Sequence, residues 1–145
     1  MNNDEEIENL LEIEKLLENT KNESILKLTP EQIKEKKEEV LEELYLPKVV
    51  IKNNLKKLKN YRYIEECNEL QFGSYLRWIN LKNIDNLKLT NGGILCEIKI
   101  DDDPILVLKN NRNQFFQINM NAALIFQKIS YQEQILLSII QFLQK

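Results

Sequence analysis

The fold is decided by residues 71–81, which read Gln71-Phe72-Gly73-Ser74-Tyr75-Leu76-Arg77-Trp78-Ile79-Asn80-Leu81. This stretch holds the single Trp of the chain, a Gly suited to a bend, and residues that favour β structure around one Arg. We expect it to form a central strand of an antiparallel sheet, with Arg77 facing inward. The chain from about Tyr61 to Ile129 should pair around this strand.

Short β segments separated by turn residues surround the central stretch. The expected strands are residues 61–66, 72–81, 87–90, 93–101, 105–109, 114–120 and 123–129. Asn91-Gly92 should close a tight hairpin between 87–90 and 93–101, because both residues tolerate positive φ. In the strand after it, alternation predicts that Ile94, Cys96, Ile98 and Ile100 face the core. A meander with no helix between its strands curls into a small barrel or a bent sheet.

Helical patterns lie before and after the sheet. Residues 2–19 repeat apolar side chains at helical spacing behind an acidic first turn. Thr29-Pro30-Glu31-Gln32 is a capping box that opens a helix to about Leu44, and Ser130-Tyr131-Gln132-Glu133 opens a last helix through Gln144. A short helix over residues 54–60 is also expected. The fold class is therefore α+β.

The expected organisation has three parts. Residues 1–46 form an acidic helical arm, residues 47–60 a basic connector, and residues 61–145 the antiparallel β domain with its C-terminal helix. Residues 1–44 carry 14 acidic and 6 basic side chains, a net charge of −8, whereas residues 45–145 carry 9 and 14, a net charge of +5. Such an asymmetry indicates a charged partner, or one part docking on the other.

Composition excludes several classes of protein. The chain has 145 residues, no His and two Cys, Cys67 and Cys96, so a zinc site or a disulfide framework is not expected, and both thiols should lie in the core. No apolar run is long enough to span a membrane, and the acidic N-terminus does not resemble a signal peptide. We expect an intracellular, cytoplasmic protein with no membrane association, no cofactor and no metal.

A non-enzymatic role in protein binding or assembly is the favoured function. The Leu-rich stripe of the arm suits helix contacts of the coiled-coil kind, and the last helix is apolar over more than half its circumference. A protein partner or a homo-oligomer would cover these surfaces, unless the arm merely completes one core. The candidate contact residues are Ile7, Leu10, Leu11, Leu17, Ile139, Phe142 and Leu143.

Nucleic-acid binding is the alternative function. Residues 48–62 contain six basic side chains and no acidic one, and Tyr61, Tyr63, Tyr75 and Trp78 are available for base stacking if their face of the sheet is open. A pI near 5.2 is low for such a protein. The candidate residues are Lys48, Lys52, Lys56, Lys57, Lys59, Arg62 and Arg77.

A metal-dependent nuclease is a remote third candidate. Asp85, Glu97 and Lys99 follow the D…ExK pattern, in which two carboxylates hold a divalent ion. The same residues also fit the solvated face of an alternating strand. Residues 101–103, three Asp before Pro104, suit a solvated turn better than a calcium loop. No catalytic residue is therefore assigned.

Residues 69–129 resemble a small domain found in nucleocytoplasmic large DNA viruses such as the mimivirus group. The resemblance is carried by residues 70–79 (LQFGSYLRWI), 89–93 (LTNGG), 106–108 (LVL) and 114–118 (QFFQI). It implies a viral protein in the host cytoplasm or the virion, with a structural or genome-associated role. These are turn and core residues, so the resemblance transfers no site residue.

Overall fold

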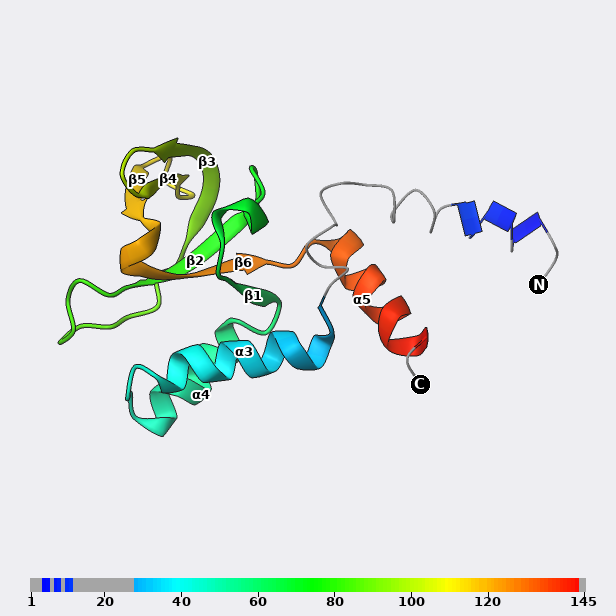
Figure 1. The fold of residues 1–145 in the computed structure, drawn as a ribbon, viewed down its shortest axis with the longest axis horizontal. Coiled ribbons are helices and arrows are strands. Elements are labelled where there is room, and N and C mark those ends of the chain that lie inside the picture. Colours follow the sequence, from blue (N-terminus) through cyan, green and yellow to red (C-terminus); the bar gives the residue numbers. More distant parts are fainter. Residues whose placement is uncertain (1–3, 6, 9, 12–27, 144–145) are drawn as a thin grey trace. The chain divides into compact units, whose positions relative to one another are not determined.

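The computed structural model describes residues 4, 5, 7, 8, 10, 11 and 28–143. By its contacts the chain divides into two compact units, Ile33–Ile129 on the one hand and Met1–Gln32 with Ser130–Lys145 on the other. The expected boundaries at residues 46 and 60 both fall inside the first unit. The helices that precede the sheet thus belong to the same unit as the sheet from Ile33 onward (Figure 1).

The sheet has six antiparallel strands in the order β1-β6-β2-β3-β4-β5. The strands are β1 (Tyr61–Ile64), β2 (Tyr75–Asn80), β3 (Gly93–Ile100), β4 (Pro104–Lys109), β5 (Phe115–Asn119) and β6 (Ala123–Lys128). β2 lies inside the sheet, between β6 and β3, as expected for the stretch that holds Trp78. Since the edge strands β1 and β5 do not pair with each other, the sheet is open and bent rather than a closed barrel, and the α+β class is confirmed.

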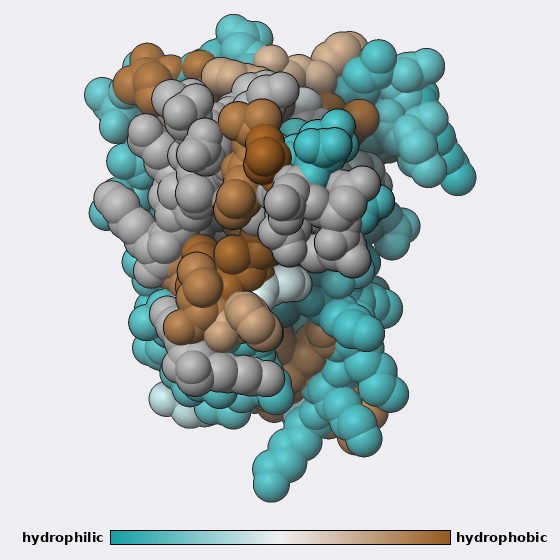
Figure 2. All heavy atoms as spheres, turned by 90° about the vertical axis from the view of Figure 1, so that its right-hand side faces the viewer, coloured by the Kyte–Doolittle hydropathy of each residue, from teal (hydrophilic) through white to brown (hydrophobic). Residues whose placement is uncertain are grey.

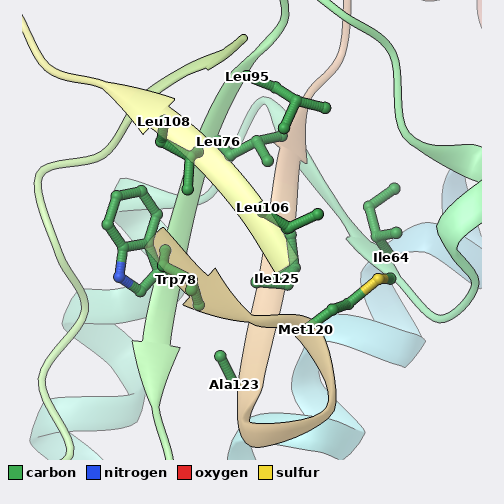
Figure 3. Close-up of a cluster of buried hydrophobic side chains, with 10 residues drawn as sticks. Ile64, Leu76, Trp78, Leu95, Leu106, Leu108, Met120, Ala123 and Ile125 are labelled. Atoms are coloured by element: carbon green, nitrogen blue, oxygen red, sulfur yellow. The ribbon is translucent and has the colours of Figure 1, made fainter. Parts of the chain in front are cut away.

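One face of the sheet curls around a core to which all six strands contribute. Leu76 and Trp78 alternate along β2 and point into it, where they meet Leu106 and Leu108 of β4 (Figure 3). The remaining buried members are Ile64, Leu95, Ile118, Met120, Ala123 and Ile125. Because strands distant in sequence share these contacts, burial of apolar area holds the bend of the sheet.

The other face of the sheet packs against two helices, α3 (Pro30–Glu42) and α4 (Lys48–Lys57). Val40 and Leu41 of α3 and Leu58, just after α4, contact Ile79 of β2 and Phe126 of β6. Figure 1 shows the two helices next to each other beside the β1 end of the sheet. The helices therefore share a core with the sheet.

The start of α3 agrees with the capping box in the sequence. The backbone N–H of Gln32 donates to Oγ1 of Thr29 at 3.1 Å, and the N–H of Thr29 donates to Oε1 of Gln32 at 3.0 Å. The expectation for α4 was wrong, because this helix begins at Lys48 rather than at Asn54. Pro47, in an extended conformation, directly precedes the helix, and Ile51, Leu55 and Leu58 recur at helical spacing toward the core.

The hairpin expected at Asn91-Gly92 does not form. Residues 87–90 are not a strand; Leu89 pairs with Ile79 in an isolated bridge, and β3 continues in the same direction to pair with Tyr75 and Leu76. The register shifts by one residue between these two pairings. Gly92, with φ +96°, therefore serves a kink along β2 rather than a reversal of the chain.

The face assignment along β3 is confirmed for Ile98, which packs against the core, but it was wrong for Ile94, Cys96 and Ile100. A bulge after Leu95 leaves Cys96 without a partner in β4, since Leu95 pairs with Leu108 and Glu97 pairs with Val107. Leu95 is buried, Ile94 and Ile100 are exposed, and Cys96 is exposed instead of lying in the core. Cys67, in the short 3-10 helix η2 (Cys67–Glu69), is half-buried against the central core.

The last helix, α5 (Tyr131–Leu143), begins at the predicted capping box. The N–H of Glu133 donates to the hydroxyl oxygen of Ser130 at 3.1 Å, and the N–H of Ser130 donates to Oε1 of Glu133 at 3.0 Å. Within the described residues, no helix is long and apolar enough to cross a membrane.

Candidate protein-docking groove

An open groove of about 880 Å³ runs between α3 and α4. Three rows of side chains line it, and each row is spaced so that its members share one helix face. The α3 wall carries Lys34, Glu38 and Glu42; the α4 wall carries Lys48, Lys52 and Lys56, followed by Lys59; and Ile51 and Leu55, with Leu46 and Tyr45 from the connection, form an apolar floor. We call this site the α3–α4 groove.

The side chains that line the groove carry a net positive charge. Its lining holds five Lys and two Glu, a net charge of +3. All four ammonium groups on the α4 side follow one edge of the floor, whereas both carboxylates lie on the α3 side. Lysine stems can cover apolar surface while their ammonium groups stay in water. The arrangement therefore presents a strip of positive charge beside an apolar strip.

The helical hairpin that forms the groove is fixed at both ends. At its closed end, the connection of residues 43–47 includes Tyr45 with φ +54°, and the N–H groups of Val50 and Ile51 donate to the carbonyl of Pro47. At the other end, Nζ of Lys37 donates to the carbonyl of Leu58 at 2.8 Å, directly after α4. A cation at a helix C-terminus stabilises the orphan carbonyls there.

Lys36 and Lys37, two neighbouring residues of α3, make contacts that hold the helical hairpin in place. Burial lowers the pKa of Lys37, which is 6 % exposed and faces away from solvent. A hydrogen bond to the carboxylate of Glu65 raises the pKa of Lys36, with an Nζ–Oε1 distance of 2.8 Å. Lys36 thereby ties α3 to the segment after β1. Neither side chain lines the groove.

The basic residues proposed for nucleic-acid binding are divided by the structure. Lys48, Lys52, Lys56 and Lys59 come together along the groove, but Lys57 is exposed outside its lining. Arg62 is buried, and its Nη1 lies 3.4 Å from Oε1 of Glu69 in an ion pair. A buried, paired guanidinium is not available to phosphate, so Arg62 leaves the candidate set.

Arg62 belongs to a polar network inside the sheet. Its Nη2 donates to the carbonyl of Glu69, which also accepts from Nε2 of the fully buried Gln127. Oε2 of Glu69 accepts from the N–H groups of Glu65 and Glu66. The contacts of Arg62 and Gln127 join β1 and β6 to the segment of η2, so the network holds the connection between β1 and β2.

Arg77 is half-buried and is bound to a backbone carbonyl. Its Nε donates to the carbonyl of Thr90 at 2.8 Å, while the Thr90 hydroxyl oxygen accepts from the N–H of Trp78. Thr90 thus fastens the chain before β3 to β2. Arg77 therefore makes a structural contact and does not lie on an open face of the sheet that could bind nucleic acid.

The aromatic residues considered for base stacking do not share one face. Tyr61 and Tyr63 pack in the core under the helices, where burial raises the pKa of each phenol. Tyr75 and Trp78 line a second pocket of about 590 Å³. Its other walls are residues 90–92, the turn of residues 110–114 and Phe116. Trp78, 7 % exposed, is chiefly a core residue.

The residues expected to contact a protein partner lie in the other unit, Met1–Gln32 with Ser130–Lys145. Residues 4, 5, 7, 8, 10 and 11 are helical, and Ile7, Leu10 and Leu11 are 55, 61 and 53 % exposed. In α5, Ile139 is half-buried, and Phe142 and Leu143 are exposed. Leu17 lies outside the described residues. Figure 2 shows hydrophobic atoms at the surface among hydrophilic ones.

The carboxylates considered for metal binding do not gather. Asp85 lies in the exposed connection after β2, and Glu97 and Lys99 are exposed on β3. Across the described residues, no three His, Cys, Asp or Glu side chains are grouped to hold a metal ion. Asp103 instead accepts from the side-chain amides of Asn119 and Asn121, at 3.0 and 2.8 Å, which lowers its pKa.

The sequence reading missed half of the groove. It identified the lysines of residues 48–59 as a basic surface, but not Lys34, Glu38 and Glu42 as the facing wall, nor Ile51 and Leu55 as a floor. The available signal was the four-residue repeat in both segments, because Lys34, Glu38 and Glu42 match Lys48, Lys52 and Lys56 in spacing.

Comparison with protein-family models, curated proteins and solved structures finds no match to this chain.

Proposed function

We propose that this protein is a non-enzymatic protein-binding module, and that the α3–α4 groove takes up an acidic, amphipathic helix of a protein partner. The single observation that carries the proposal is the row Lys48, Lys52 and Lys56 beside the apolar floor of Ile51 and Leu55. Helices that bind in grooves place apolar residues at i, i+3, i+4 and i+7 on the floor. Acidic residues beside that stripe would meet the lysines.

The chemistry of the groove supports a helix over a nucleic acid. A polyanion would meet Glu38 and Glu42 on the α3 wall, and its backbone would leave the apolar floor uncovered. An amphipathic helix covers the floor and satisfies the lysines together. Complementary charge would chiefly set the association rate and the choice of partner, while the apolar contact would supply much of the affinity.

The proposal can be tested with full-length protein and a fluorescent acidic probe helix. The probe is a designed 18-residue peptide with a Leu stripe flanked by Glu, and its binding is followed by anisotropy. The variant Lys52→Glu with Lys56→Glu should weaken binding at least about tenfold, because two attractions become repulsions. The matched control, Lys82→Glu with Lys88→Glu, changes the net charge equally at exposed positions away from the groove.

Two further probes define the limits of this test. A peptide with Lys in place of every Glu should not bind the wild-type protein. A single-stranded oligonucleotide of similar charge should bind more weakly than the acidic peptide. Tighter binding of the oligonucleotide, lost in the Lys52→Glu, Lys56→Glu variant, would replace the proposal with the nucleic-acid alternative. Equal peptide binding by both double variants would remove the groove as the site.

A further inference from the structure

The chain itself contains a segment with the chemistry that the α3–α4 groove would select. Residues 2–19 hold seven acidic residues and one Lys, a net charge of −6, on a helical pattern with an apolar stripe. The groove lining has a net charge of +3. We infer that residues 2–19 of a second copy of this chain occupy the groove, an inference that rests on the proposed function.

The spacing of charges on the two sides agrees. Carboxylates recur every four residues at positions 4, 8 and 12, and lysines recur every four residues at positions 48, 52 and 56. In an α-helix this interval is a rise of about 6 Å. Two helices with the same interval can align each carboxylate with one ammonium group along the whole row. A segment with irregular charge spacing could not do this.

The apolar positions show the same correspondence. Ile7 and Leu11 are four residues apart on the acidic segment, as are Ile51 and Leu55 on the floor of the groove. An 18-residue helix is about 27 Å long, which exceeds the roughly 15 Å of the ten-residue α4. One segment is therefore long enough to cover the whole floor.

A second copy can supply this segment, because each chain carries one acidic segment and one groove. Ile7, Leu10 and Leu11 are each more than half exposed, and the groove is open within its own unit. An apolar stripe in water is a liability that association relieves. Two copies that exchange their acidic segments would fill both grooves at once. Such a reciprocal exchange closes with twofold symmetry and does not propagate into a filament.

The test is the mass of full-length protein in solution, measured by light scattering and sedimentation from low to high micromolar concentration. The wild-type protein should have twice the 17.3 kDa chain mass. Leu10→Glu with Leu11→Glu should give a monomer, and so should Lys52→Glu with Lys56→Glu. The matched control, Lys82→Glu with Lys88→Glu, should remain dimeric. All substituted Leu and Lys side chains are exposed, so folding should be retained.

A charge-exchange variant and a mixture of two variants identify the contact itself. Adding Glu8→Lys and Glu12→Lys to the Lys52→Glu, Lys56→Glu protein exchanges the charges across the proposed interface and should restore the dimer. Mixing the Leu10→Glu, Leu11→Glu monomer with the Lys52→Glu, Lys56→Glu monomer should give a heterodimer, because one intact groove meets one intact segment.

The outcomes separate this inference from the proposed function. A wild-type monomer at every concentration overturns the exchange; if that monomer still binds the acidic probe peptide, the groove function survives. A monomer in which a peptide of residues 2–19 fails to bind, while the designed probe binds, shows that the natural occupant is another protein. A dimer that persists in both double variants also overturns the inference, since its interface must lie elsewhere.

Discussion

At the scale of single residues, Gly92 shows how a correct local signal can have a different structural use. Its suitability for positive φ was evident from the sequence, and φ is +96°. The sequence could not show that the residue sits where β2 is joined by Leu89 on one side of the kink and by Gly93 on the other. A turn and a bulge make the same demand on φ, and only pairing partners distinguish them.

Replacing Gly92 by Ala should cost about 3 kcal/mol of the free energy of unfolding, because a Cβ there would overlap the carbonyl oxygen of Leu76 and the ring of Tyr75 in addition to the strain of positive φ. Gly73→Ala is the matched control, with φ +83° and open space around a Cβ, and should cost about 1 kcal/mol. Urea unfolding followed by Trp78 fluorescence measures both. Equal costs would contradict the close approach at Gly92.

The Asp103 carboxylate gives a prediction about pH. Its bonds from Asn119 and Asn121 lower its pKa in the folded state, so the stabilisation they give is complete above the ordinary pKa of 3.8 and is lost as pH falls through the lower folded value. Between neutral pH and strongly acidic pH, the wild-type protein should therefore lose more stability than Asp103→Asn. The control Asp102→Asn should follow the wild-type curve; if Asp103→Asn follows it too, the two amides contribute nothing.

The burial of Arg62 and the exposure of Cys96 could not be predicted from residue type alone. Arg is usually exposed and Cys usually buried. Arg62 is buried because the carboxylate and the backbone carbonyl of Glu69, in η2, lie next to it. Cys96 is exposed because a bulge removes it from the strand pattern. Both causes are contacts between segments, which no single stretch of sequence contains.

At the scale of elements, the caps and the strand pattern were the most predictable features. The boxes at Thr29 and Ser130 form as expected because each is completed within four residues of sequence. The start of α4 was misplaced, since the sequence predicted a short helix over residues 54–60 and the helix begins at Lys48. Packing of Ile51 and Leu55 against the sheet outweighs the weak propensity of this segment.

The packing of α3 against the sheet can be measured through Leu41, which is fully buried between α3, α4 and β6. Leu41→Ala should cost about 3 kcal/mol, from lost transfer free energy and the remaining cavity. Val49→Ala, an apolar truncation at a site 70 % exposed on α4, should change stability by less than about 0.5 kcal/mol. A small cost at Leu41 would mean that α3 behaves as a separate arm.

At the scale of the whole molecule, the charge asymmetry of the sequence has a local counterpart. The excess of Lys after residue 45 is concentrated along the wall of one groove, and the acidic excess includes residues 2–19. The sequence could indicate that the two parts differ in sign. It could not indicate the apolar floor, because Ile51 and Leu55 become a floor only when α3 lies beside α4.

Peptide binding in the α3–α4 groove can be measured most directly by titrating full-length, ¹⁵N-labelled protein with the designed acidic peptide and following the backbone amide signals. We expect saturable shifts concentrated at residues 34–59 and strongest at Ile51, Lys52 and Leu55, with saturation at a peptide concentration at least about tenfold higher in the Lys52→Glu, Lys56→Glu variant. Shifts centred on the pocket lined by Tyr75, Asn91 and Phe116, or no shifts at saturating peptide, would contradict this expectation.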